Sequence, residues 1–255
     1  MAMHRVLDTK FSFLTCLFWR YRMEKWPKQI PSLTQEQITV RNDFMKYWLT
    51  VLPKRYGIVE RFNHGYAAKR GFFKNCTTLE IGAGLGEHVA YEHMNEQEYT
   101  VMELRDELAD EIKKKYPSVT TLVGDCQEKI PSKNGSFDRI LAIHVLEHLP
   151  NLPAALKEIH RILKSKEGRF IVVIPCEGGL CYSFARQISA KRIFQKRYHQ
   201  SYDWLISIEH INRPDEIISE LQKLFTIEEM SYFPLKIPSV TLNLCIGMVL
   251  VKRDL

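Results

Sequence analysis

The chain has 255 residues, 45% of them hydrophobic, and a formal net charge of +6. Its length and apolar content allow one domain with additions to bury a large core. Six cysteines are scattered without a CxxC pair, which argues against a zinc ribbon and against a dense disulfide framework. Reduced thiols in the cytoplasm fit this pattern best.

The positive charge lies at the N-terminal end, where residues 1–70 hold 13 Lys/Arg against 5 Asp/Glu. This asymmetry indicates an anionic partner, such as a phosphate-bearing substrate, a membrane surface or a nucleic acid, or simply a solvated basic face. The apolar run at residues 11–19 is too short to span a bilayer, and no small-residue cleavage site follows it. We expect a lid or packing helix there, in preference to an amphipathic helix that makes peripheral membrane contact.

Two helices are predicted after this segment. In residues 34–51 the apolar side chains follow one helical face, Thr34 and Gln37 form a capping box, and Pro53 ends the helix. A second helix covers about residues 55–70, and Gly71 breaks its pattern. We therefore divide the chain into a helical extension or lid, 1–70, and a main domain, 71–255. The apolar face consists of Ile38, Val40, Phe44, Tyr47, Trp48 and Val51.

From residue 77 short apolar strands alternate with amphipathic helices, which is typical of βαβ units around a parallel sheet. We place strands at 77–82, 98–103, 118–123, 137–143 and 168–175, and helices at 86–94, 106–116 and 152–164. Residues 177–212 interrupt the alternation and form a basic insertion after the fifth strand. A helix at 213–224 and strands at 225–233 and 241–251 complete an α/β fold.

A glycine-rich turn joins the first strand to the next segment in TLEIGAGLGEHVA, residues 78–90. Glycines allow a tight turn and close approach to a ligand, and a helix beginning there would offer free amides. The spacing is not the GxGxxG of dinucleotide sites, because the third glycine comes one residue early and Glu87 takes its place. An acid there disfavours a diphosphate, and Glu80 adds a carboxylate suited to a cationic ligand.

Acidic residues follow the next two strands. Glu103 ends the second strand, 21 residues after Gly82, where it can accept hydrogen bonds from ribose hydroxyls. Asp125 and the Cys126 amide follow the third strand, where an adenine edge could be read. Open α/β sheets bind ligands at the carboxyl ends of successive strands, so acids in this order favour a ligand site over solvent-exposed helix caps.

Residues 77–175 resemble a class I S-adenosylmethionine (SAM)-dependent methyltransferase of the methyltransferase-domain family, types 11 and 25. The resemblance is carried by ExGxGxG from Glu80 to Gly86, by the acid Glu103, by the GDC turn at Asp125, and by the stretch from Phe137 to Leu149. These motifs are specific for the cofactor, SAM. They say almost nothing about the methyl acceptor.

The resemblance implies a Rossmann-like, mostly parallel sheet of seven strands in the order 3-2-1-4-5-7-6, with the last strand antiparallel. It places the methionine part of SAM on the glycine turn, the ribose on Glu103 and the adenine amino group on Asp125. The helical extension and the insertion become the acceptor-defining parts. The expected cofactor-binding residues are Glu80, Gly82, Ala83, Gly84, Gly86, Glu103, Leu104, Asp125, Cys126, Ile143 and His144.

Two histidines are candidates for proton removal from the acceptor. His144 leaves the fourth strand on the ligand side, and His210 precedes the late helix in a loop that should overhang the same cleft. Alternatively, His144 packs on the cofactor and His210 caps a helix. The cluster of His144, Glu147 and His148 suggests a metal site, because a related quinone-modifying group uses acids and a histidine here, but His144 replaces that group's first acid, so we expect no metal.

We expect methyl transfer to the oxygen or nitrogen of a small-molecule, glycan or lipid-linked acceptor, which the basic insertion suggests is anionic. An RNA methyltransferase is a second hypothesis, favoured by basic residues interleaved with aromatics. The chain lacks an N/D-P-P-Y/F motif and a recognisable RNA-binding module, so nucleic acid is the less favoured acceptor. A SAM-binding protein without turnover is the third hypothesis. The oligomeric state is left open.

Overall fold

The computed structural model describes residues 26–253. Its centre is one sheet of seven strands in the order β3-β2-β1-β4-β5-β7-β6, as predicted. Strands β1 to β5 run parallel, and β7 pairs antiparallel with both β5 and β6. The strands are β1 (Cys76–Ile81), β2 (Gln97–Glu103), β3 (Thr120–Val123), β4 (Arg139–Ile143), β5 (Arg169–Pro175), β6 (Phe225–Phe233) and β7 (Cys245–Lys252).

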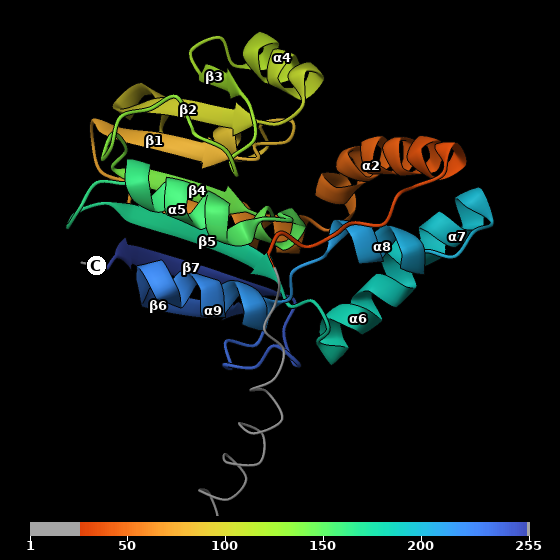
Figure 1. The fold of residues 1–255 in the computed structure, drawn as a ribbon. Helices are drawn as coiled ribbons and strands as arrows, with labels where there is room; N and C mark the ends of the chain where they lie inside the picture. Colours follow the sequence, from red (N-terminus) through yellow and green to blue (C-terminus); the bar gives the residue numbers. More distant parts are fainter. Residues whose placement is uncertain (1–25, 254–255) are drawn as a thin grey trace, which may run out of the picture.

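Helices cover both faces of the sheet. On one face α5 (Leu152–Ile162) and α9 (Pro214–Leu224) pack on the larger hydrophobic core, and Figure 1 shows them in front of the strands. On the other face α3 (Gly57–Ala68) and α4 (Asp106–Lys115) bury Tyr66, Ala67 and Ile112 against β2, β4 and β5. Burial on both faces explains why β4 and β5 are continuously apolar after their first residue rather than alternating.

A second group of helices lies beyond the carboxyl ends of the parallel strands (Figure 1). It combines α2 with the insertion, and the two halves share a small core around Phe44 and Phe194. We call this group the helical cap. It consists of α2 (Gln35–Arg55), α6 (Leu180–Arg186), the π-helical turn η4 (Gln187–Lys191), α7 (Arg192–Tyr198) and α8 (Asp203–Glu209).

The predicted N-terminal extension therefore has two parts with different surroundings. Helix α2 contacts the insertion, whereas α3 is part of the sheet's second layer. The capping box is confirmed, since the Gln37 amide donates to Thr34 Oγ1 and the Thr34 amide to Gln37 Oε1. Ile38 is 38% exposed rather than buried, and α2 runs two residues past Pro53 to Arg55.

One predicted helix, 86–94, is wrong. Two short 3-10 turns replace it, η1 (His88–Tyr91) and η2 (Met94–Glu96). The short stretch between β1 and β2 must first make the glycine turn and then direct Glu92 inward to the guanidinium of Arg139 on β4, with His88 paired to Glu92. That inward pairing of polar side chains overrides the amphipathic pattern.

Residues 1–25, including the predicted lid or surface helix and Cys16, lie outside the described residues. Within residues 26–253, no helix combines the length and the apolar character that crossing a bilayer requires.

Candidate functional site

The turn after β1 depends on backbone conformations that favour glycine. Gly82, Gly84 and Gly86 all have positive φ angles, of 67°, 60° and 73°. A Cβ on Gly82 would lie 2.6 Å from Cγ2 of Val145, in the segment that follows β4. The glycines therefore let the turn lie directly against the end of β4, at the edge of the sheet where parallel α/β proteins bind ligands.

Two carboxylates hold the amides of this turn. The Gly84 amide donates to Glu103 Oε2 at 3.0 Å, and the Leu85 amide donates to Glu87 Oε2 at 3.1 Å. Glu103 is only 6% exposed, and its other oxygen accepts the amide of Leu104 at 3.0 Å. These amides, which would bind a diphosphate in a dinucleotide site, already face negative charge, and no α-helix begins behind them. The turn therefore disfavours phosphate and suits a cationic ligand.

The turn after β3 is built around Asp125. Its Oδ1 accepts the backbone amide of Gln127 at 2.8 Å, and the Gln127 side chain in turn accepts the amide of Asn151 at 2.6 Å. Cys126 is buried, which together with the Asp125 charge raises the pKa of its thiol to about 12. The thiol is therefore protonated and unreactive, and the carboxylate of Asp125 is the polar group of this turn.

The remaining expected contacts differ in exposure. Ala83 is 5% exposed and Ile143 is half-buried at the end of β4. Glu80 is 3% exposed on β1 and accepts a hydrogen bond from the Tyr99 hydroxyl at 2.8 Å, on the neighbouring strand. Burial raises the pKa of Glu80 to about 8. The side chain of Glu80 thus lies on a face of the sheet, where it is held by Tyr99 of β2.

His144 follows β4 with a φ of 54°, a left-handed conformation that is uncommon for a residue with a Cβ. Such strained positions cluster at functional sites. Its Nδ1 lies 3.2 Å from Glu147 Oε1, while its Nε2 is buried without a hydrogen-bond partner. Burial by itself lowers the pKa of His144, but the neighbouring side chains of Cys245 and Glu147 outweigh it and raise the pKa to about 10. His144 is thus a hydrogen-bond donor to Glu147.

The structure brings His210 to the same place from a distant part of the chain. His210 and His148 pack edge to face with their ring centroids 5.1 Å apart. His210 Nδ1 lies 2.9 Å from Glu177 Oε2, and His148 Nδ1 lies 3.6 Å from Glu209 Oε2. The predicted pair His144 and His210 therefore belongs to one group at the junction of the sheet and the helical cap. Its members are His144, His148, His210, Glu147, Glu177 and Glu209.

Burial and neighbouring charges shift the pKa values of the side chains in this group in different directions. Burial by itself raises the pKa of Glu147, but the hydrogen bond from His144 and the nearby His148 outweigh it and lower the pKa to about 2. Burial lowers the pKa of His148, which favours its neutral form. At neutral pH the buried carboxylate of Glu147 therefore lies between the charged imidazole of His144 and the neutral imidazole of His148.

Three members of the site were missed in the sequence. Glu177 and Glu209 contact the histidines, and Asn212 anchors the loop, because its Nδ2 donates to the carbonyls of Leu146 and Leu149 at 2.8 Å each. No local pattern marks these residues, since their partners lie 33 to 66 residues away in the chain.

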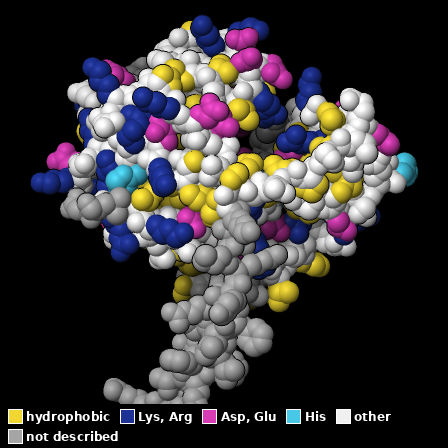
Figure 2. Space-filling view, viewed as in Figure 1, with side chains coloured by type: hydrophobic (Ala, Val, Ile, Leu, Met, Phe, Trp, Pro, Cys, Tyr) yellow, Lys and Arg dark blue, Asp and Glu magenta, His cyan; other side chains and the backbone are white. Residues whose placement is uncertain are grey.

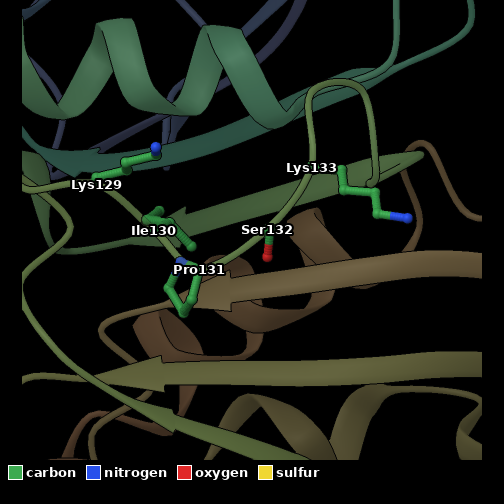
Figure 3. Close-up of a pocket in the computed structure, with 5 residues that line it drawn as sticks. All are labelled: Lys129, Ile130, Pro131, Ser132 and Lys133. Atoms are coloured by element: carbon green, nitrogen blue, oxygen red, sulfur yellow. The ribbon is translucent and has the colours of Figure 1, made fainter.

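A depression of about 460 Å³ lies elsewhere, in the segment before β4 (Figure 3). It is lined by residues 129–133, and Figure 3 shows Lys129 and Lys133 on opposite sides of Ile130, Pro131 and Ser132, with amines that do not meet. None of the site residues described above lines it, and its lysines do not converge. The chemistry therefore belongs to the carboxyl edge of the sheet.

A parallel sheet with the order 3-2-1-4-5-7-6, a glycine turn capped by carboxylates and acids at the ends of β2 and β3 define a Rossmann-like domain of the kind that binds a nucleoside without a diphosphate. Comparison with known proteins identifies that class. Residues 79–172 match the methyltransferase-domain family.

Two curated proteins align with shorter stretches. The sterol 4-C-methyltransferase strm-1 of Caenorhabditis elegans is 45% identical over 51 residues, which is 20% of this chain and 15% of that protein. An uncharacterized protein of Methanocaldococcus jannaschii is 53% identical over 45 residues, which is 18% of this chain and 19% of that protein. The alignments thus span less than a fifth of these relatives' length.

Solved structures share the fold over most of the chain. A TehB-like SAM-dependent methyltransferase from Corynebacterium glutamicum superposes with a TM-score of 0.55 and 17% identity, covering 85% of this chain and 100% of that one. A protein from Pyrococcus horikoshii gives 0.61 and 14%, covering 82% and 99%. The Haloferax volcanii protein in complex with the methyltransferase activator Trm112 gives 0.60 and 15%, covering 87% and 99%.

Residues 79–172 therefore match a methyltransferase domain, and the fold around them is that of class I SAM-dependent methyltransferases, whose cofactor is SAM.

Proposed function

We propose that this protein transfers the methyl group of SAM to an oxygen or nitrogen atom of an acceptor that enters between the sheet edge and the helical cap. The observation that carries this proposal is the capping of the glycine turn by Glu87 and Glu103, which suits a cationic nucleoside and opposes a diphosphate. The residues fit SAM in charge, and the glycines leave room for a ligand on the turn.

In this proposal the turn carries the methionine part of SAM, with Gly82, Ala83, Gly84 and Gly86 providing close backbone approach. Glu103 and Leu104 bind the ribose end, and Asp125 with the Cys126 amide reads the adenine edge. Ile143 and His144 line the cofactor, whereas the burial of Glu80 under Tyr99 supports a structural role for that carboxylate.

Bound SAM supplies an activated methyl group, which the acceptor's lone pair attacks as the bond to sulfur breaks and leaves S-adenosylhomocysteine. The protein must hold the acceptor in line and remove its proton. His144 is held against Glu147 and its Nε2 is buried, which supports a positioning role. We assign proton removal to His210, whose Nδ1 donates to Glu177 and thereby leaves Nε2 as the basic nitrogen.

The helical cap favours a lipid-linked acceptor over a free small molecule or a glycan. Leu180, Phe184 and Ile188 are 72%, 67% and 59% exposed and follow one another at helical spacing on α6 and η4. An exposed apolar row of this kind is typical of a surface that meets apolar ligands. By its name, the curated sterol methyltransferase also acts on an apolar acceptor.

The basic residues of the insertion give less support to an anionic acceptor than the sequence suggested. Arg186 pairs with Glu177, Lys191 with Asp203 at 3.0 Å, and Arg197 with Asp43 at 3.0 Å. On the face shown in Figure 2, Lys and Arg are interspersed with acids and form no continuous basic patch. This distribution also disfavours RNA, which needs a basic track along its backbone.

Methyl transfer can be tested with SAM labelled on its methyl group and three acceptor sets: extracted lipids, soluble glycans and total RNA. We expect label in the lipid fraction, and we expect His210→Ala to lower turnover by about a hundredfold or more while SAM affinity stays unchanged. His93→Ala, an exposed histidine outside the site, is the matched control. Label in RNA alone would contradict the acceptor, and SAM binding without any product would favour a binding protein without turnover.

A further inference from the structure

The six ionisable side chains at the junction of sheet and cap are arranged in two layers. Glu147, His148 and His210 form the inner layer, and their ligand-capable atoms all lie within 4.8 Å of one another. Glu147 is fully buried, yet its Oε2 has no hydrogen-bond partner among the described residues. Leaving a buried polar atom unpaired is costly, so this oxygen requires a partner that the described side chains do not supply.

Each inner side chain also has an outer partner. His144 Nδ1 lies 3.2 Å from Glu147 Oε1, which leaves Oε2 free to face inward. Glu177 Oε2 lies 2.9 Å from His210 Nδ1, and Glu209 Oε2 lies 3.6 Å from His148 Nδ1. Metal-binding residues characteristically have such second partners, which fix the histidine tautomer and the orientation of the ligand.

Two arginines balance the charge of the outer glutamates. Arg186 pairs with Glu177, and Arg41 of α2 pairs with Glu209. The outer carboxylates are thereby paired with arginines, whereas Oε2 of Glu147 has no hydrogen-bond partner among the described residues.

We propose that Glu147, His148 and His210 bind one divalent transition-metal ion of the zinc class. Two imidazoles and one carboxylate suit zinc, iron or manganese, whereas magnesium and calcium prefer an all-oxygen set. Ligand atoms of a tetrahedral zinc site lie about 3.3 Å apart, so the ligands must move inward by a small distance. His148 and His210 are partly exposed, with side-chain exposures of 33% and 16%, and have room to do so.

Three protein ligands leave a position open, as in zinc sites that bind water or substrate. This consequence rests on the proposed function: an acceptor hydroxyl or amine bound there would lose its proton more readily, and His210 would serve as a ligand instead of the base. The sequence suggested the cluster His144, Glu147 and His148, and it argued against a metal because His144 replaces an acid of the related group. The structure instead makes His144 the outer partner of Glu147 and brings in His210 from before α9.

The test is metal binding to untagged protein that has been stripped with a chelator and titrated with zinc, then separately with magnesium. We expect one zinc per chain and no competition from magnesium. Glu147→Gln and His148→Ala should each weaken zinc binding at least tenfold, and Glu177→Gln, which changes only an outer partner, by about tenfold. His93→Ala should bind zinc like the unmodified protein.

SAM affinity measured in the same samples reports that each variant is folded and separates this inference from the proposed function. Zinc bound by a protein that does not bind SAM would support the metal site and contradict methyl transfer. SAM binding and methyl transfer without stoichiometric zinc, or zinc affinity unchanged by Glu147→Gln and His148→Ala, would overturn the metal site and leave methyl transfer standing.

Discussion

Arg139, on the central strand β4, is fully buried and shows how single residues fix this fold. Its guanidinium donates to both oxygens of Glu92 at 2.8 Å and to the carbonyls of Ala67 and Arg70 at the end of α3. His88 Nε2 lies 2.6 Å from Glu92 Oε1 and completes the network. Because a buried charge is tolerated only when it is paired, Arg139 determines where α3 and the segment after the glycine turn must lie.

Removing the partner of Arg139 should therefore be costly. We expect Glu92→Gln to lower the free energy of unfolding by about 3–5 kcal/mol, because the buried guanidinium loses its counter-charge. Urea unfolding of both proteins at neutral pH measures this. Glu96→Gln, an exposed acid a few residues further on, is the control and should change stability by less than about 0.5 kcal/mol. Equal stability of Glu92→Gln and the unmodified protein would contradict the role of the pair.

The same network predicts the acid sensitivity of the fold. Burial alone raises the pKa of Glu92, but hydrogen bonds from His88 and Arg139 lower it from 4.5 to about 2, so its stabilisation is complete above pH 4.5 and is lost as the pH falls toward 2. Burial lowers the pKa of His88 from 6.5 to about 4, so its contribution is lost between those values. Stability from this pair should fall with pH below 6.5, and below pH 4.5 the fall should be shallower in Glu92→Gln.

At the scale of elements, the sequence predicts the sheet well because each central strand is buried on both faces and bounded by turn residues. The strand positions agree with the structure to within two residues for β1, β2, β4, β5 and β6. The helix expected at 86–94 fails because an amphipathic pattern does not reveal that Glu92 pairs with the distant Arg139 and that His88 pairs with Glu92. The sequence correctly placed Glu103 at the end of β2 and Asp125 after β3, because the alternation of strands and helices shows where each strand ends.

The site is only partly predictable, because some of its contacts join residues that are close in the chain and others join residues that are far apart. His144 and Glu147 are close in the chain, and their proximity follows from the end of β4. His210 was expected at the cleft from the position of its loop, but its partner Glu177 is 33 residues away, so no spacing rule finds it. Contacts between the insertion and the sheet depend on how the helical cap packs, which local sequence does not specify.

The helical cap should be able to loosen without the sheet. Phe44 is 2% exposed and packs edge to face on Phe194, with ring centroids 5.1 Å apart. We expect Phe44→Ala to remove about 3–5 kcal/mol of packing from the cap, seen as faster amide hydrogen exchange in α2, α7 and α8 while β1 and β4 stay protected. Ile38→Ala, at an exposed position on the same helix, should leave exchange unchanged. Equal loss of protection in sheet and cap would contradict a separate cap.

Over the whole molecule, the sheet supplies a rigid edge and the cap closes over it. The edge carries the glycine turn and the carboxylates of Glu103 and Asp125, and the junction with the cap carries the histidines. In the proposed function, cofactor recognition belongs to the sheet edge and acceptor chemistry to its junction with the cap, and the cap helices lie outside the matched residues 79–172.

The most direct test of this account is calorimetric titration of the purified protein with SAM, with S-adenosylhomocysteine and with NAD. We predict binding of the two thio-nucleosides at one site, no binding of NAD, and affinity for SAM about tenfold weaker in Glu103→Gln, which keeps the side chain's size but removes its charge. Binding of NAD or a flavin without binding of SAM would contradict the account.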